Sequence, residues 1–152
     1  MRSSERDPAD RAPTPNPSRA REGSSLRIAG YAAIFHIEDR GGDVIEPGAF
    51  TQSLAAIEPG ALPLLWQHDP LRRIGTVTYA AEDRKGLRVI AALTPEGAAL
   101  ARRDWHGGLS FGYRVRASEG ERPRRLLQLD LVEVSLVRLP MQALAKIHLR
   151  SG

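Results

Sequence analysis

A serine flanked by glycines is the first residue of this chain whose type and surroundings could support chemistry. Ser110 lies between Leu109 and Phe111, and glycines stand on both sides of that trio within residues 107–113. Glycine permits sharp turns and a close approach of another backbone, so a serine here could be presented to a substrate as a nucleophile. An ordinary serine at a turn that enters a strand explains the same pattern, because serine is common in turns.

A histidine in a second segment could act as the base that such a serine needs. His68 follows an apolar run over residues 62–67 that predicts a strand, and Asp69 and Pro70 end that run. Imidazole has an ordinary pKa of about 6.5, which suits a general base. The two interpretations, a base that points into a cleft and a satisfied core histidine, are about equally supported by the residue type.

A glutamate in a third segment must have a partner. Alternation over residues 127–137 predicts a strand with Glu133 on the same face as three leucines, while the other face is apolar from Val132 onward. An unpaired buried carboxylate is costly and tends to become neutral. The sequence therefore predicts either a structural arginine or a functional histidine beside Glu133.

The elements that must position these residues are mostly strands. Short-period apolar patterns predict further strands at residues 26–35, 74–79, 87–93 and 111–116, with a brief pairing at 44–46. Two helices are predicted, one from residues 47–50 to Ile57 and one that starts at Thr94 and Pro95 and ends near residue 105. Residues 117–125 are predicted to be a charged, solvated connection. These patterns indicate a mainly β fold with peripheral α-helices.

Composition limits the classes of protein that fit. The chain has 152 residues, 41% of them hydrophobic and 26% charged, which is ordinary for one globular domain. It has no cysteine, so a disulfide framework and thiolate chemistry are excluded. We expect no membrane span and no secretory signal, because no apolar run is long enough. A net charge of +4 permits weak affinity for nucleic acid, but no specific nucleic-acid motif supports it.

The first part of the chain differs from the rest. Residues 1–25 contain several prolines with scattered Arg, Ser and Asp and almost no large apolar side chain. Such a segment cannot bury enough surface to offset its ordering entropy. We predict a disordered tail over residues 1–25 and a folded domain over residues 26–152.

Four motifs in order resemble one protein family. They are Leu-Trp-Gln-His-Asp at 65–69, Ile-Gly at 74–75, Leu-Ser-Phe-Gly-Tyr at 109–113 and Glu-Val-Ser-Leu-Val at 133–137. Together with residues 30–35 and 41–50, they resemble the prohead maturation proteases of HK97-type tailed phages. The resemblance covers about residues 26–147. It departs from the family pattern at residues 140–143, where an asparagine is expected soon after the proline.

The resemblance implies a fold, an activity and a site. The implied fold is a closed or partly open β-barrel flanked by helices, related to the herpesvirus capsid-assembly protease. The implied activity is that of a serine endopeptidase with Ser110 as nucleophile, His68 as base and Glu133 as the residue that orients the base. Backbone amides, or a water held by Arg138, would stabilise the oxyanion. No cofactor and no metal are expected.

The resemblance also implies partners and a location. The substrates would be the major capsid protein, the scaffold segment and the chain itself, and a homodimer is compatible with the family. The protease would act in the bacterial cytoplasm, inside the assembling procapsid. Relatives of this kind are also encoded by prophages and gene transfer agents.

Other interpretations compete with this one. Residues 108–112 also fit the G-x-S-x-G pattern of α/β-hydrolases, with Asp130 and His148 in the right order. That fold needs a helix after the serine, whereas a strand is predicted there, and too few residues follow. A non-catalytic β-rich capsid-assembly or scaffold protein is the main alternative, and a nucleic-acid-binding module rests on the basic charge alone. If Glu133 were not in the site, Asp69 would be the next acid to consider.

Overall fold

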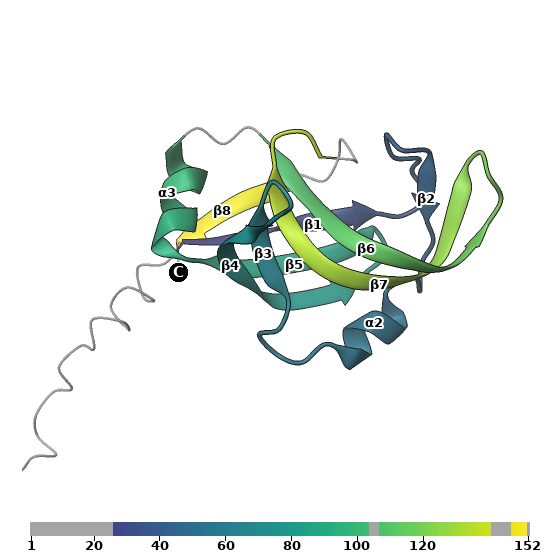
Figure 1. Cartoon of the computed structure of the whole chain (residues 1–152), viewed down its shortest axis with the longest axis horizontal. Helices are drawn as coiled ribbons and strands as arrows, with labels where there is room; N and C mark the ends of the chain where they lie inside the picture. Colours follow the sequence, from purple (N-terminus) through teal and green to yellow (C-terminus); the bar gives the residue numbers. More distant parts are fainter. Residues whose placement is uncertain (1–25, 104–106, 141–146, 152) are drawn as a thin grey trace, which may run out of the picture.

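The computed structural model describes residues 26–103, 107–140 and 147–151, and for the last range it describes the backbone. Eight strands form one curled sheet in the order β2-β7-β3-β4-β5-β1-β8, and β6 pairs with β7 outside this path (Figure 1). The strands are β1 Leu26–Ile34, β2 Asp43–Ile45, β3 Pro63–Trp66, β4 Asp69–Glu82, β5 Gly86–Leu93, β6 Gly108–Glu119, β7 Arg124–Val137 and β8 Ile147–Ser151. The helices are α2 Thr51–Ala56 and α3 Pro95–Arg103.

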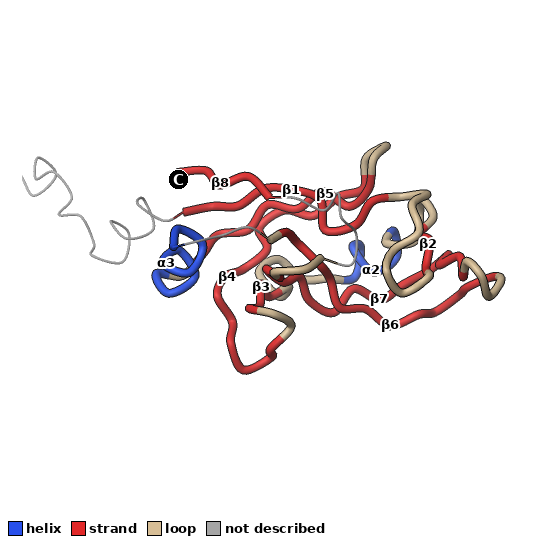
Figure 2. The backbone as a smooth tube through the Cα atoms, turned by 90° about the horizontal axis from the view of Figure 1, so that it is seen from above, coloured by secondary structure: helices blue, strands red, loops and turns tan. Residues whose placement is uncertain are grey.

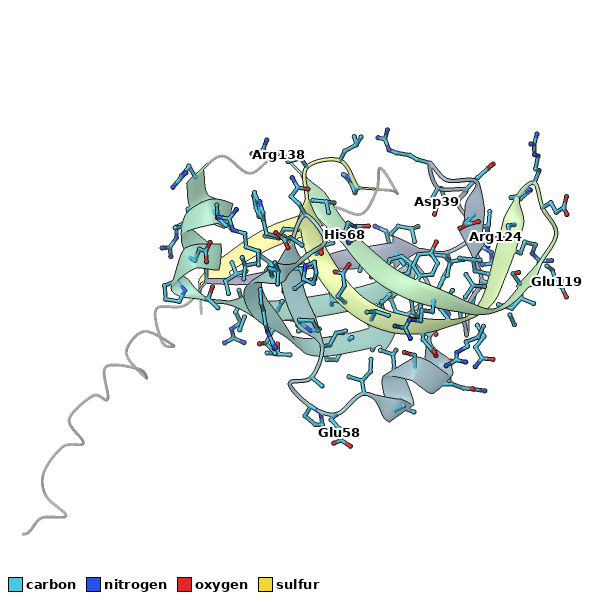
Figure 3. The ribbon with its side chains drawn as sticks, in the orientation of Figure 1. Asp39, Glu58, His68, Glu119, Arg124 and Arg138 are labelled. Carbon is cyan, nitrogen blue, oxygen red and sulfur yellow. The ribbon has the colours of Figure 1, made fainter. Side chains whose placement is uncertain are left out.

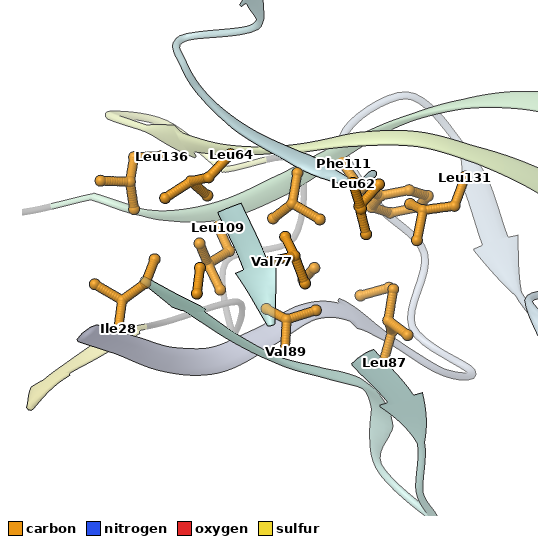
Figure 4. Packing of buried hydrophobic residues seen from close by; sticks show 14 of the residues in the cluster. Ile28, Leu62, Leu64, Val77, Leu87, Val89, Leu109, Phe111, Leu131 and Leu136 are labelled. Carbon is orange, nitrogen blue, oxygen red and sulfur yellow. The ribbon is translucent and has the colours of Figure 1, made fainter. Parts of the chain in front are cut away.

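The sheet curls into a partly open barrel around one apolar core. Figure 2 shows β1, β5 and β8 on one side of the molecule and β6 and β7 on the opposite side. In β5, Leu87, Val89 and Ala91 alternate with more exposed residues and are fully buried, as the predicted strand requires. Figure 4 shows Leu87 and Val89 facing Leu109 and Leu131 from the opposite side of the barrel. The mainly β fold class is therefore confirmed.

Strand β7 organises the part of the sheet that carries the candidate residues. One of its edges pairs antiparallel with β6 along almost its whole length. Its other edge pairs in parallel with β2 and then with β3. In the part of β7 between its pairings with β2 and β3, the Leu129 N–H donates to Ala49 O at 2.9 Å and the Leu131 N–H donates to Ser53 Oγ at 2.8 Å. Because both edges are occupied, the position of the buried residues of β7 is firmly set.

Helix α3 begins as its sequence predicts. The Gly97 N–H donates to Thr94 Oγ1 at 3.1 Å, so Thr94 is the N-cap residue and Pro95 occupies the first helical position. Gly97 lies directly against β4, because a Cβ there would come within 2.2 Å of Ile74 O. The helix is described as far as Arg103, and residues 104–106 lie outside the described part of the chain.

Several predicted boundaries were wrong. Residues 117–125 are not a plain loop, because β6 continues to Glu119 and β7 already begins at Arg124. Both strands of that hairpin carry charged, exposed residues, so backbone pairing continues where the apolar alternation stops. Strand β4 begins at Asp69 rather than residue 74, helix α2 begins only at Thr51, and β8 was not predicted.

Two other outcomes concern burial and the first residues of the chain. Val132 was expected to lie on a buried face, but its exposed fraction is 46%, and the pairing with β6 passes over it, from Leu131 opposite Tyr113 to Glu133 opposite Gly112. The predicted disordered tail, residues 1–25, lies outside the described residues. No helix in the described part of the chain is long and apolar enough to cross a membrane.

Candidate active site

His68 occupies a two-residue turn between β3 and β4. Trp66 pairs with Asp69, so Gln67 and His68 form the turn, with φ angles of 52° and 61°. Positive φ at both central residues is typical of a type I′ hairpin turn, but it is uncommon for residues other than Gly, Asn and Asp. Strained conformations of this kind persist where the surrounding structure fixes them, and they cluster at functional sites.

Hydrogen bonds to β7 fix this turn. The Gln67 N–H donates to Leu136 O at 2.9 Å, and the Arg138 N–H donates to Gln67 Oε1 at 3.1 Å. The His68 N–H donates to Ser135 Oγ at 3.1 Å. The turn is therefore attached at three points, to Ser135 and Leu136 of β7 and to Arg138 just after it, and these contacts place His68 beside the last residues of that strand. Figure 3 shows His68 and Arg138 at the same end of the barrel.

The carboxylate of Glu133 lies in contact with the imidazole of His68. Glu133 Oε1 is hydrogen-bonded to His68 Nδ1, and Glu133 Oε2 accepts a hydrogen bond from Ser135 Oγ at 2.6 Å. The hydrogen bond from Glu133 raises the pKa of His68 above its ordinary value, and burial opposes this rise only in part. With Nδ1 bonded to the carboxylate, Nε2 is the nitrogen left to accept a proton from another group.

The glycine at position 112 makes room for this carboxylate. Gly112 lies directly opposite Glu133 in the β6–β7 pair, and a Cβ on Gly112 would come within 2.6 Å of Glu133 Oε1. Any side chain at this position would displace the carboxylate from the place where it meets His68. The absence of a side chain at Gly112 is thus part of the site's construction.

Ser110 lies on the neighbouring strand and on the same face. It is the third residue of β6, not a turn residue before the strand, and it is paired directly with Ser135. Residues directly opposite in an antiparallel pair project to the same face, with Cβ atoms about 4.5–5.5 Å apart. Ser110 is 5% exposed, and within the described ranges its hydroxyl forms no hydrogen bond that would tie it to another side chain.

The structure therefore brings two of the expected residues into contact and the third close to them. His68 and Glu133 are bonded, and Ser110 lies across from Ser135, which contacts both. Glu133 has a histidine partner and not the structural arginine that was the alternative. The predicted alternation placed Glu133 on the same face as Leu129 and Leu131, and this was wrong. A bulge at Val132 pairs Leu131 with Tyr113 and Glu133 with Gly112, which are adjacent in β6 and project to opposite faces. Glu133 is therefore buried on the face that it shares with Ser110 and Ser135.

Ser135 is the residue of this cluster that sequence reasoning did not single out. It is 0% exposed and bonds to both His68 and Glu133. The sequence did carry one signal, since Ser135 follows Glu133 by two positions and must share its face of the strand. Its contact with His68 could not be inferred without the position of the β3–β4 turn.

The acids of the competing interpretations lie in other contacts. Asp130 forms an ion pair with Arg116, and Asp69 Oδ1 accepts the N–H of Leu71 at 2.9 Å. Ser110 is followed by a strand and not by a helix, so the α/β-hydrolase interpretation is excluded. Across the described residues, His, Asp and Glu side chains form no group of three or more that could hold a metal ion.

Comparisons with known proteins show the family of the chain and its fold. Residues 15–151 match the sequence profile of a family described as caudovirus prohead serine protease. The chain belongs to this family. The prohead protease of Enterobacteria phage HK97 is 39% identical over 101 residues, which are 62% of this chain and 44% of that protein. The chain therefore spans less than half the length of this relative.

Solved structures with a similar fold come from herpesviruses. The protease of Kaposi's sarcoma herpesvirus has a TM-score of 0.62 and 18% identity, over 84% of this chain and 66% of that one. Varicella-zoster virus protease has a TM-score of 0.56 and 15% identity, over 82% and 64%. The predicted family and the predicted likeness to the herpesvirus protease fold are both confirmed.

Proposed function

We propose that this chain is a serine endopeptidase that matures a phage-like prohead. It acts inside the assembling procapsid, in the bacterial cytoplasm. The observation that carries the proposal is the buried Glu133 bonded to His68 Nδ1, one strand away from Ser110. An acid, an imidazole and a serine in this order are the parts of a hydrolytic triad, and the family to which the chain belongs is that of prohead serine proteases.

Each residue has a distinct task in the proposed mechanism. Ser110 Oγ attacks the carbonyl carbon of the scissile peptide bond while His68 Nε2 takes its proton. Glu133 holds the Nδ1–H tautomer and stabilises the imidazolium that forms. His68 then protonates the leaving amine, and a water repeats the sequence on the acyl-enzyme. Backbone amides, or a water held by Arg138, would stabilise the oxyanion; the Arg138 N–H itself is engaged by Gln67.

The proposed substrates are proteins of the immature shell. They are the removable part of the major capsid protein, the scaffold protein and other copies of this chain. Family membership and the name of the HK97 relative, a prohead protease, support this choice. A protease that is packaged with its substrates inside a shell would meet them at high effective concentration.

Co-expression with the capsid protein of the same genome tests the proposal. We expect Ser110→Ala to leave the fold intact and to abolish capsid-protein processing on a gel, because loss of the nucleophile costs about 10⁶-fold in a well-studied serine protease. Ser118→Ala is the matched control, since Ser118 lies on the exposed end of the same strand. Normal processing by Ser110→Ala would remove Ser110 from its role. If the unmutated chain leaves the capsid protein unprocessed but normal shells still form, the alternative function, a non-catalytic capsid-assembly protein, would be favoured.

A further inference from the structure

Ser135 stands at the centre of the candidate site without belonging to the triad. It is completely buried in β7 and lies directly opposite Ser110. A buried hydroxyl must be hydrogen-bonded to avoid a large desolvation cost. Both hydrogen bonds formed by this hydroxyl within the described chain go to the other members of the site, one to His68 and one to Glu133.

The chemistry of these bonds fixes the direction of each. The His68 main-chain N–H can only donate, so Ser135 Oγ accepts from it at 3.1 Å. The single proton of the hydroxyl is then directed to Glu133 Oε2, at 2.6 Å. One carboxylate oxygen is held by Ser135, and this orientation leaves Oε1 to face His68 Nδ1. Ser135 thus joins the backbone of the base to the carboxylate that orients it.

The same arrangement argues against Ser135 as a nucleophile. Its proton is committed to a carboxylate, its side chain is wholly buried, and it bonds to the main chain of His68 and not to the ring. A structural role alone is also an insufficient description. Ser53 is an example of a purely structural serine, because its buried hydroxyl accepts the N–H of Leu131, a residue of β7 outside the site.

We propose that Ser135 is a positioning residue that holds the Glu133 carboxylate and the His68 turn in register. This inference rests on the proposed function of the site. The loss of its hydroxyl frees the carboxylate to rotate and leaves the His68 N–H without its acceptor. The imidazole is then no longer held in the Nδ1–H tautomer, which the transfer of a proton from Ser110 to Nε2 requires.

Ser135→Ala tests the inference through two independent measurements on purified protein. The first is the ¹⁵N NMR spectrum of the His68 ring over a pH titration. We expect the Nε2–H tautomer to appear and the pKa of His68 to fall toward its ordinary value. The second is peptide cleavage, where we expect kcat to fall by about ten- to a hundred-fold, the equivalent of one hydrogen bond to a charged group, with KM nearly unchanged.

Ser53→Ala is the matched control, because it removes a buried hydroxyl that also accepts a main-chain N–H. It should lower thermal stability but leave the His68 tautomer and the kcat of the folded fraction unchanged. If Ser135→Ala does not fold, Ser135→Cys replaces it, since a thiol is close in size but a weaker donor, and the same shifts should be smaller.

The outcomes separate this inference from the proposed function. An unchanged or higher pKa of His68, with an unchanged tautomer, in folded Ser135→Ala would overturn the positioning role even if the unmutated chain cleaves peptides. A shifted tautomer in a chain that cleaves nothing would support the positioning role and reject the protease. An equal loss of kcat in Ser53→Ala would show that general destabilisation, and not positioning, explains the effect.

Discussion

The bond between His68 and Glu133 determines how the site should respond to pH. The bond raises the pKa of His68, so protonated His68 is favoured in the folded chain relative to the unfolded chain. The stability that this shift provides is complete below the ordinary histidine pKa of about 6.5, and it is lost as pH rises through the raised value. A base that must be neutral to accept a proton also becomes active only as pH rises through the raised value.

Replacing Glu133 by glutamine tests this pair. Glu133→Gln should remain folded, lower the pKa of His68 and reduce peptide cleavage by about 10⁴-fold, because an amide favours the wrong tautomer. The melting temperature should fall more at pH 6 than at pH 9, because the part of the carboxylate's contribution that comes from the raised pKa of His68 is present only at the lower pH. Thermal denaturation at both pH values and a rate profile on the same sample measure both effects.

Glu121→Gln is the control for this charge change, since Glu121 is exposed at the end of the β6–β7 hairpin. A folded and fully active Glu133→Gln variant would remove Glu133 from the site and leave a Ser110–His68 dyad. Asp69 would then be the next acid to replace, although its Oδ1 already accepts the Leu71 N–H. Lower stability with normal activity would indicate a purely structural role.

At the scale of elements, the β3–β4 turn is the part that positions His68, the proposed base. Its two central residues have positive φ, and Gln67 binds β7 through its N–H and Arg138, just after β7, through its side-chain oxygen. Glycine tolerates positive φ without strain, so Gln67→Gly removes the side-chain hydrogen bond without straining the turn. We expect kcat to fall about tenfold while the melting temperature stays nearly unchanged.

A second histidine with positive φ provides the comparison for this prediction. His36 has a φ of 63°, is exposed and forms an ion pair with Glu46 at 3.5 Å, away from the candidate site. His36→Gly should leave peptide cleavage unchanged. If Gln67→Gly cleaves peptides as fast as the unmutated chain, the bond between Gln67 and Arg138 has no part in aiming His68.

The elements also show how far sequence reasoning could reach. Alternation identified β5 and β7 as strands, but it placed Glu133 on the wrong face of β7. The bulge at Val132 reverses the alternation there, and no count of alternate residues could predict it. Alternation also failed over residues 117–125, where two paired strands expose charged residues on both faces and no apolar period remains. The parallel pairing of β7 with β2 and β3 joins distant segments, so no local pattern could reveal it. The contact of Ser135 with His68 depends on that pairing.

At the scale of the molecule, the first strand of the barrel, β1, begins at Leu26. Strand β1 starts there and pairs with β5 on one edge and β8 on the other, and Leu26 and Ile28 are part of the buried core. The candidate site lies where the start of β6, the end of β7 and the β3–β4 turn meet. Side-chain hydrogen bonds in the site join residues 67–68 to residues 133–138.

This arrangement leads to a prediction for residues 1–25, which we propose to be a disordered and dispensable tail. Their composition offers almost no apolar surface to bury, so a chain that starts at Leu26 should fold with a free energy of unfolding within about 0.5 kcal/mol of the full chain. Peptide cleavage should be unchanged. Because the family match begins at residue 15, a chain that starts there is the informative control. If that chain is stable but the one that starts at Leu26 is not, residues 15–25 pack on the barrel, and hydrogen exchange would show protected amides there.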